Sequence, residues 1–308
     1  MRSPRHTRNL IMAALLSGLA GLVVLVVAFT RLQAQAFIKP RPVASLAETP
    51  ADYGLAYEEV ALTAADGTQL AAWYVLAAQG NGAAMVLVHG LGANRAALLP
   101  TARILVRHGY GVLLLDLRAH GQSEGEFLTY GYYESDDVLA ALAYLNERPE
   151  VQSGRIGLLG TSMGAAAAIR AAAGSDIPQA MVIESTYSSL PAAVNDAFGK
   201  LSLLPAWPFA PLVVKWAERE VGVDISQVDS ARDLAGFAPR SVLLIHGTAD
   251  DLFPLEHHRR LFQSARGPKE QWIVEGMGHE SPALFAPKVY EQRLIDFLDR
   301  HLNPRPSS

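Results

Sequence analysis

Short apolar runs alternate with amphipathic stretches along most of the chain. The runs are continuous rather than alternating, which is typical of parallel strands buried on both faces of a sheet. They lie at residues 83–89, 111–116, 155–160, 180–185, 241–246 and 271–276. The stretches between them predict crossover helices at 95–108, 132–148, 163–173, 256–265 and 283–301. Residues 57–76 predict a hairpin around the turn sequence AADG. The pattern therefore predicts an α/β fold with a doubly wound, mostly parallel sheet of about eight strands.

Residues 186–238 interrupt this rhythm, because they are too long for a plain crossover and are rich in proline. Loops at the carboxyl ends of parallel strands surround the active site in doubly wound sheets, so we expect an inserted helical lid there. The insertion is apolar around Trp207 and Phe209, and we expect these rings to line an acyl pocket. Tyr187, just past a predicted strand, is expected at the entrance of the pocket together with Glu184, or else as an anchor of the lid. The alternative is an extra helix pair that only packs on the sheet.

The N-terminal segment has a different pattern. Residues 10–29 carry no charge and follow three arginines. As a helix they span about 30 Å, the thickness of the hydrocarbon core of a bilayer. We predict a signal anchor over residues 1–30, a linker over 31–55 and a globular domain over 56–302, held outside the cytoplasm. The alternative is a signal peptide cleaved near Ala36, where the sequence AQA offers a site, which would release a secreted domain.

The amino-acid composition argues against several classes of function. The chain has 26 basic and 30 acidic residues, so it lacks the basic excess of nucleic-acid-binding proteins. It contains no cysteine, which excludes disulfides, thiolate catalysis and cysteine zinc sites. No metal-binding H-E-x-x-H or dinucleotide-binding G-x-G-x-x-G motif occurs, so we expect neither a metal nor a cofactor. The sequence does not indicate an oligomeric state.

The candidate chemistry begins at Ser162. It stands between Gly160 and Gly164 in a G-x-S-x-G motif, after one predicted strand and before one predicted helix. This context predicts a nucleophile elbow, a turn so sharp that its flanking residues have almost no side chain. The following helix N-terminus favours developing negative charge. The alternative is a glycine-rich turn whose serine caps the helix.

With this elbow the chain resembles the α/β-hydrolase superfamily over about residues 55–302. The resemblance implies a triad in the order serine, acid, histidine. Asp250 lies in the sequence HGTADDLFP, which is similar to the superfamily's acid loop, with Asp251 as the alternative acid. His279 follows a strand and a glycine-rich turn, where the superfamily carries its base. His257 and His258, on an amphipathic helix, are expected at the surface.

The resemblance also implies an oxyanion hole. The residue after His-Gly and the residue after the nucleophile would donate their backbone N–H groups, and here these are Leu91 and Met163. The segment DLRAHGQSEGE is similar to a further superfamily motif. Within it, Asp116, Arg118 and Ser123 are expected to support the floor of the site, and a direct role for His120 is the less favoured alternative.

The sequence therefore predicts a membrane-anchored serine hydrolase that cleaves an acyl ester of a small or lipid-like molecule. A serine hydroxyl needs an imidazole base and an orienting acid, and all three residue types are present. Esters are favoured over amides because an alkoxide leaves more readily than an amine. The alternatives are a peptidase or acyl-aminoacyl hydrolase, a haloperoxidase-like or lyase reaction on the same triad, and a non-catalytic binding protein of the same fold.

Overall fold

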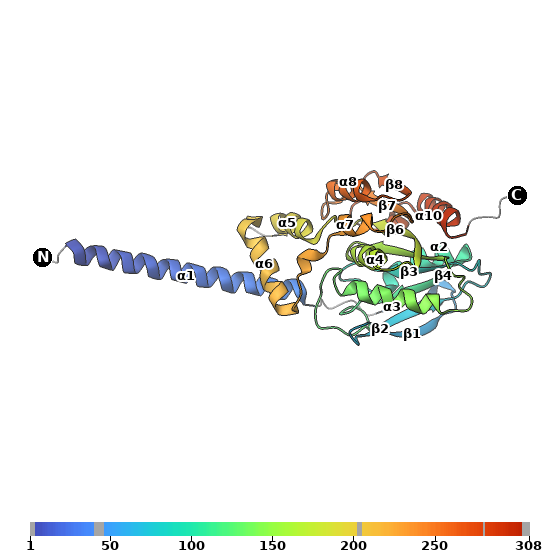
Figure 1. The fold of residues 1–308 in the computed structure, drawn as a ribbon, viewed down its shortest axis with the longest axis horizontal. Coiled ribbons are helices and arrows are strands. Elements are labelled where there is room, and N and C mark those ends of the chain that lie inside the picture. Colours follow the sequence, from blue (N-terminus) through green and yellow to red (C-terminus); the bar gives the residue numbers. More distant parts are fainter. Residues whose placement is uncertain (1–3, 40–45, 202–204, 280, 304–308) are drawn as a thin grey trace.

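One central sheet organises the protein (Figure 1). The computed structural model describes residues 4–39, 46–201, 205–279 and 281–303. The strands are β1 (Glu58–Thr63), β2 (Gln69–Val75), β3 (Ala84–Val88), β4 (Gly111–Leu115), β5 (Ile156–Thr161), β6 (Pro178–Glu184), β7 (Ser241–Gly247) and β8 (Lys269–Val274). Their order is β1-β2-β4-β3-β5-β6-β7-β8. The β1–β2 hairpin and the β2–β4 pair are antiparallel, and every other pair is parallel. The predicted sheet, including its antiparallel hairpin, is confirmed.

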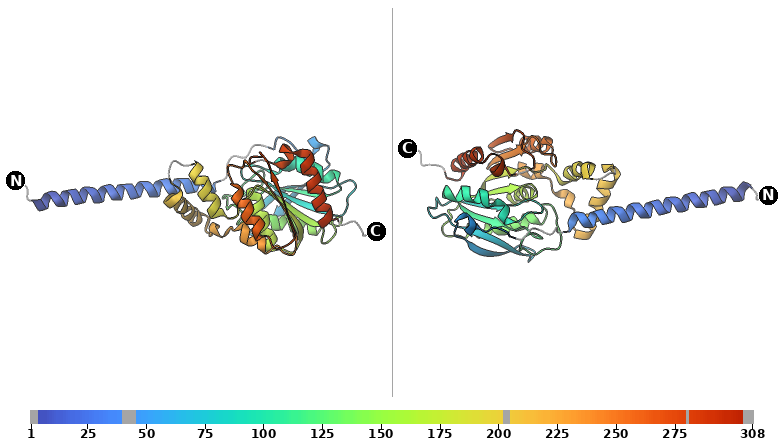
Figure 2. Two further views of the ribbon diagram at one scale, coloured as in Figure 1. Left: turned by 90° about the horizontal axis from the view of Figure 1, so that it is seen from above. Right: turned by 180° about the vertical axis from the view of Figure 1, so that it is seen from behind.

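Helices cover both faces of the sheet, as the two views of Figure 2 show. They are α2 (Leu99–Arg107), α3 (Glu134–Asn146), α4 (Met163–Ala173), α8 (Leu255–Ser264), α9 (Pro282–Phe285) and α10 (Pro287–His301). Side chains alternate along β3, so Val86 and Val88 face a core under α3 and α4. Met85 and Leu87 face the opposite core, under α2 and α10. All five residues of β3 are buried, as a strand covered on both faces requires.

The insertion between β6 and β7 is helical. It contains α5 (Leu190–Leu201), α6 (Ala206–Val221), the 3-10 turn η3 (Ile225–Gln227) and α7 (Ser230–Ala235). Helix α7 packs on α4 and α8, and α5 packs on α6. Figure 1 shows α5 and α6 at the end of the domain from which the N-terminal helix projects. The insertion therefore lies between the sheet and the N-terminal segment, because α6 packs on the N-terminal helix.

The N-terminal segment forms one helix, α1 (Pro4–Ile38), of 35 residues. Residues 31–38, expected as the start of a linker, continue this helix. Residues 40–45 of that expected linker lie outside the described residues. Among those that follow, Pro50–Tyr53 form the 3-10 turn η1. The predicted boundary at residue 30 follows the end of the apolar run. The helix continues beyond it because its last turns pack against α6 and Tyr130.

The last turns of α1 are docked onto the domain. Thr30, Ala34 and Ile38 are buried, and their spacing of four residues places them on one helix face, which packs against α6. The ring of Phe37 stacks on Tyr130 at 4.2 Å between centroids. The hydroxyl of Tyr130 donates to the Phe37 carbonyl at 2.7 Å. Helix ends leave carbonyl groups without intrahelical partners, so this contact also caps the helix.

The rest of α1 projects away from the domain. Residues Arg8–Ile38 have a mean hydropathy of 2.8 in their most apolar window, none of which is buried. Length and composition are sufficient for this helix to cross a membrane, although an N-terminal signal sequence has the same features.

Candidate active site

The turn at Ser162 is the sharpest feature at the carboxyl edge of the sheet. Ser162 lies between the last residue of β5 and the first residue of α4, with φ 55° and ψ −121°. A side chain at this positive φ costs about 1–3 kcal/mol, so the surrounding structure must hold it in place. A Cβ on Gly160 would lie 2.6 Å from the Cα of Ala165, and one on Gly164 would lie 2.2 Å from the carbonyl oxygen of His89. The motif glycines are therefore required by close packing of the backbone.

Two hydrogen bonds hold the turn. The N–H of Ser162 donates to the carbonyl of Glu184 at 2.9 Å. The hydroxyl of Thr186 donates to the carbonyl of Ser162 at 2.7 Å. Both partners come from the end of β6 and the residues after it, so the neighbouring strand fixes the turn at Ser162.

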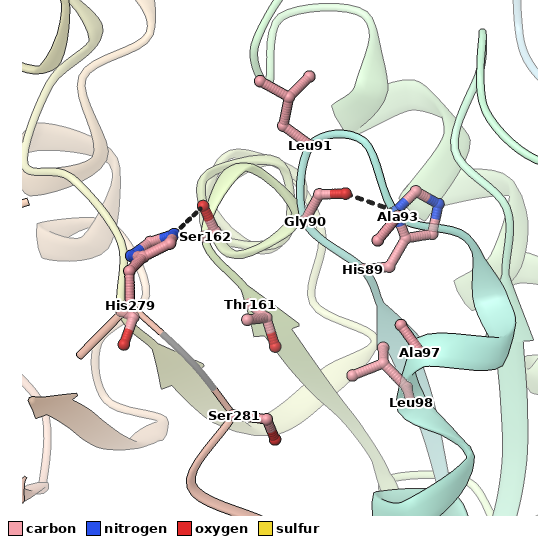
Figure 3. A pocket seen from close by; sticks show the side chains of 11 residues that line it. His89, Gly90, Leu91, Ala93, Ala97, Leu98, Thr161, Ser162, His279 and Ser281 are labelled. Atoms are coloured by element: carbon pink, nitrogen blue, oxygen red, sulfur yellow. Dashed lines mark hydrogen bonds between the residues drawn. The ribbon is translucent and has the colours of Figure 1, made fainter. Parts of the chain in front are cut away.

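The structure brings Ser162, His279 and Asp250 into one hydrogen-bonded line. The Nε2 atom of His279 lies 3.0 Å from Oγ of Ser162, and its Nδ1 atom lies 2.9 Å from Oδ2 of Asp250. Figure 3 shows the imidazole turned toward the serine hydroxyl. The three residues follow β5, β7 and β8, whose carboxyl ends meet at this edge of the sheet. Ser162 is 8% exposed, so substrate reaches it through a confined opening.

Asp250 is held as a carboxylate. Its Oδ1 atom accepts the N–H groups of Leu252 and Phe253 at 3.0 and 2.8 Å. Burial by itself raises the pKa of Asp250, but the hydrogen bonds from His279 and Phe253 outweigh burial and lower that pKa below its usual value. The alternative acid, Asp251, is exposed, and its carbonyl accepts a hydrogen bond from Lys200. Of the two candidates, it is Asp250 that contacts the imidazole.

The ring of Phe253 packs against His279. The two rings meet edge to face at 5.1 Å between centroids, and Tyr187 also contacts Phe253 edge to face at 5.2 Å. The sequence analysis did not single out Phe253, although it is the hydrophobic residue before proline in the acid loop. Tyr187 is buried, and its hydroxyl donates to the carbonyl of Tyr130 at 2.6 Å. Tyr187 therefore packs behind the acid loop and is not among the residues that line the pocket.

The loop after β3 carries Leu91 along the wall of the pocket next to Ser162. Met163 opens α4, and the first amides of a helix have no intrahelical acceptor. Buried imidazoles hold this loop. His120 accepts the N–H of Gly92 at 3.2 Å through Nε2, and His89 accepts the N–H of Leu117 at 3.1 Å. The backbone just before Leu91 thus lies close to the serine, since a Cβ on Gly90 would lie 3.1 Å from the Cβ of Ser162, and Met163 follows the serine directly.

His89 and His120 are supports that the sequence analysis did not assign. Burial, assisted by the neighbouring His120, lowers the pKa of His89 to about 3. His89 is therefore neutral, and because its Nε2 accepts a hydrogen bond from the N–H of Leu117, its Nδ1 carries the proton and donates to the carbonyl of Gly90 at 2.8 Å. The sequence signal for His89 is the His-Gly pair before the loop, which in the sequence indicated only the residue that would donate to an oxyanion.

Charged side chains brace the same loop from below. The buried carboxylate of Asp116 accepts the backbone N–H of Arg95 at 2.7 Å and its guanidinium at 2.8 Å. The hydroxyl of Ser123 donates to the carbonyl of Asp116 at 2.7 Å. Arg118 forms a buried ion pair with Asp137 at 2.6 Å. Asp116 and Ser123 thus support the segment that begins at Arg95, and Arg118 is paired separately with Asp137; none of these residues lines the pocket.

Glu184 lies beneath the elbow rather than at an entrance. Its carboxyl group is fully buried and accepts hydrogen bonds from Tyr290 at 2.5 Å and Thr161 at 3.1 Å. Burial raises the pKa of Glu184 to about 7, against the opposing effect of these two bonds. Sequence position suggested the pocket entrance, but the last residue of a central parallel strand is covered on both faces.

A pocket of 200 Å³ opens beside Ser162. It is lined by His89, Gly90, Leu91, Ala93, Ala97, Leu98, Thr161, Ser162, Ser185, His279 and Ser281 (Figure 3). The expected lid residues are not among them. Trp207 is 78% exposed and Phe209 is half-buried in α6. In the described residues one side of the pocket comes from the loop after β3 and the 3-10 turn η2 (Arg95–Leu98), and the rest comes from the ends of β5 and β6 and from His279 and Ser281.

The expectation that His257 and His258 lie at the surface was wrong. Both are buried, at 3% and 2% exposed. His257 lies 3.1 Å from Asp196 of α5 and accepts the N–H of Ser188. His258 lies 3.0 Å from Gln271 of β8. Polar partners from neighbouring elements make burial possible, and the helical pattern alone did not reveal them. Across the described ranges, no group of three or more histidine or acidic side chains could hold a metal ion.

Comparison with known proteins identifies the family. The chain matches the alpha/beta hydrolase family over residues 85–292 and belongs to it. It is 30% identical over 241 residues to the uncharacterized protein Rv2307c of Mycobacterium tuberculosis, covering 78% of each chain. It is 27% identical over 318 residues to the uncharacterized protein YfhR of Salmonella typhi, covering 98% of this chain and 99% of that protein. It also resembles the solved structure of the Pyrococcus furiosus esterase Pf2001, with a TM-score of 0.72 and 25% identity, covering 86% of this chain and 98% of that one.

The first prediction separates the two candidate acids. Asp250→Asn removes the negative charge that lies next to Nδ1 of His279. We expect kcat for an activated ester to fall by about 10⁴-fold. Asp251→Asn is the matched control and should change kcat by less than about threefold, because the exposed Asp251 side chain has no contact with the imidazole. Equal losses in the two variants would contradict the assignment.

The second prediction concerns Glu184 and pH. Its folded-state pKa of about 7 lies above the ordinary value of 4.5, so the carboxyl stabilises the fold fully below about pH 4.5 and loses that contribution as the pH rises through about 7. The loss is about 3 kcal/mol at most. Glu184→Gln cannot ionise. We therefore expect the thermal midpoint in detergent to fall more steeply for the natural protein than for Glu184→Gln between about pH 5 and about pH 8.

The control for this experiment is Glu270→Gln, which removes an exposed carboxylate paired with Arg300. Its pH dependence should follow that of the natural protein. Parallel curves for the natural protein and Glu184→Gln would show that the buried carboxyl does not titrate in this range.

Proposed function

We propose that this protein is a serine hydrolase that cleaves an acyl ester through a covalent acyl-enzyme. The observation that carries the proposal is the line of hydrogen bonds from Asp250 through His279 to Ser162. A base within hydrogen-bond reach of a nucleophile, and itself oriented by a third group, is the arrangement that activates a weak hydroxyl nucleophile. A non-catalytic binding protein would have no need to maintain it.

The proposed reaction follows from the geometry. The Oγ atom of Ser162 attacks the acyl carbonyl while Nε2 of His279 takes its proton. Asp250 stays ionised, because the pKa of its carboxyl is lowered, and stabilises the imidazolium. The N–H groups of Leu91 and Met163 donate to the oxyanion, and each such donor contributes about 2.7–4 kcal/mol to transition-state stabilisation. His279 then protonates the departing alkoxide, and a water molecule activated by the same imidazole releases the acid.

The size of the pocket bounds the substrate. Its 200 Å³ is smaller than the about 300–1,000 Å³ of sites for drug-sized ligands. The part of the substrate next to the carbonyl is therefore short or narrow, and it lies against small side chains such as Ala93 and Ala97. The esterase Pf2001, whose fold this chain shares, supports an ester rather than an amide substrate.

We further propose that α1 is retained as a membrane anchor with the hydrolase domain on the extracytoplasmic side. Cleavage after Ala36 would remove Thr30 and Ala34, which are fully buried against the domain. A signal peptide destined for removal gains nothing from such packing. The hydrogen bond from Tyr130 to the Phe37 carbonyl further supports a continuous helix.

The third prediction tests the nucleophile. Ser162→Ala should leave a folded protein whose kcat/KM for p-nitrophenyl esters is lower by at least about 10³-fold. Ser281→Ala is the matched control, because Ser281 also lines the pocket but only caps α9. It should keep activity within about tenfold. Activity retained by Ser162→Ala would end the proposal. Activity on acyl-aminoacyl amides but not on esters would move it to a peptidase.

The fourth prediction tests the anchor. Membranes washed with alkaline carbonate should keep the full-length protein in the pellet, because a helix that spans the bilayer is not released by removing peripheral contacts. N-terminal sequencing should find residues 10–29 in the mature protein. A soluble mature form that begins at Phe37 would establish the cleaved signal peptide instead.

A further inference from the structure

Helix α6 has an apolar face that no part of the described domain covers. Trp207 is 78% exposed and Leu212 is 38% exposed, and Pro208 and Pro211 between them are also exposed. We call these four residues the α6 face. Residues 201–214 carry no charge, whereas Lys215, Arg219 and Glu220 follow in the second half of the helix. Large exposed apolar groups gathered on one element mark a surface that meets a partner or a membrane.

The position of α6 relative to α1 identifies the partner. Burial along α1 begins inside its apolar run, where Val26 and Phe29 are half-buried and Thr30 is fully buried. Helix α6 is the element that packs along this end of α1. Figure 1 shows α6 beside α1, on the side of the domain from which α1 projects.

The depth of this contact follows from helix geometry. If residues 10–29 fill the hydrocarbon core, Val26 lies about 4.5 Å inside its boundary, since a helix rises about 1.5 Å per residue. Whatever packs against Val26 and Phe29 must then lie at the level of the lipid headgroups or just below it. Arg31, the first charged residue after the run, lies over the ring of Trp216 of α6 at 5.9 Å. Tryptophan and arginine are the side chains that favour this interface.

We propose that the α6 face is inserted in the interfacial layer of the bilayer that α1 crosses, so that the insertion between β6 and β7 lies on the membrane surface. This inference rests on the proposed membrane anchor and adds a second, independent point of contact. Helix α6 would lie in the interface as amphipathic helices do, its apolar residues about 5–10 Å deep in the headgroup region. The charged side chains from Lys215 onward would reach into water, while the Trp216 ring stays against Arg31 at the level of the headgroups. The active-site edge of the sheet would then be held toward the bilayer rather than away from it.

The absence of cysteine from the chain allows a direct test by site-directed spin labelling. The full-length protein would carry a single nitroxide at Trp207→Cys or Leu212→Cys and be reconstituted in phosphatidylcholine vesicles. Accessibility to oxygen, which concentrates in lipid, is compared with accessibility to a water-soluble nickel chelate. We expect both sites to favour oxygen over nickel by at least about threefold relative to an exposed site on the domain, as immersion of this face in the headgroup region requires.

Two matched sites make the outcomes distinguishable. Leu76→Cys replaces a residue of the domain that is 49% exposed, and it should favour nickel. Leu19→Cys lies in the middle of the apolar run and should favour oxygen.

If Leu19 reports lipid but Trp207 and Leu212 report water, the anchor stands and this inference fails. If Leu19 also reports water, the anchor itself fails. Low accessibility to both reagents at Trp207 and Leu212 would mean that a protein, such as a second copy, covers the face, which also overturns the inference. Ester hydrolysis by each labelled variant verifies its fold.

Discussion

The backbone turn at Ser162 is the constraint on which the rest of the site depends. A non-glycine residue at positive φ is held there by the carbonyl of Glu184 and the hydroxyl of Thr186. Gly164 allows the helix behind the serine to approach the backbone of His89, where any side chain would collide. The same approach brings the loop that carries Leu91 beside the start of α4. One close contact between two backbones therefore sets the position of Ser162 and of the loop beside it.

Buried polar groups next to this contact hold the two backbones in place. The Asp116–Arg95 pair, the neutral His89 and the carboxyl of Glu184 are all buried, and each is hydrogen-bonded to backbone or to a neighbouring side chain. Removing one partner from such a set leaves another buried polar group unsatisfied, at a cost of about 1–3 kcal/mol. The rigidity of the site thus comes from several strands at once, and it does not depend on the insertion that carries α5 and α6.

Sequence patterns were sufficient for the sheet and for the elements that meet at its carboxyl edge, because buried parallel strands and a glycine-flanked serine have strong local signals. Features that depend on partners distant in the chain were not predictable. His257 and His258 looked like surface residues until Asp196 and Gln271 were seen to pair with them. Glu184 was expected at the pocket entrance because nothing local shows that Tyr290 of α10 covers it. The helical stretch 31–38 is stabilised by Tyr130, whose hydroxyl donates to the carbonyl of Phe37, and this partner is distant in the chain. Trp207 was expected in an acyl pocket, yet its ring lies on the outside of α6, since an apolar residue in an insertion does not indicate which side it faces.

The most direct measurement is the site of covalent modification by a fluorophosphonate. The full-length protein would be labelled in detergent, digested with trypsin and mapped by mass spectrometry. Cleavage after Arg155 and Arg170 isolates a peptide of residues 156–170 that contains Ser162. The account predicts a single phosphonate adduct on Ser162, formed in step with the loss of ester hydrolysis and much more slowly in His279→Ala. An adduct on another residue, or loss of activity without modification of this peptide, would contradict it.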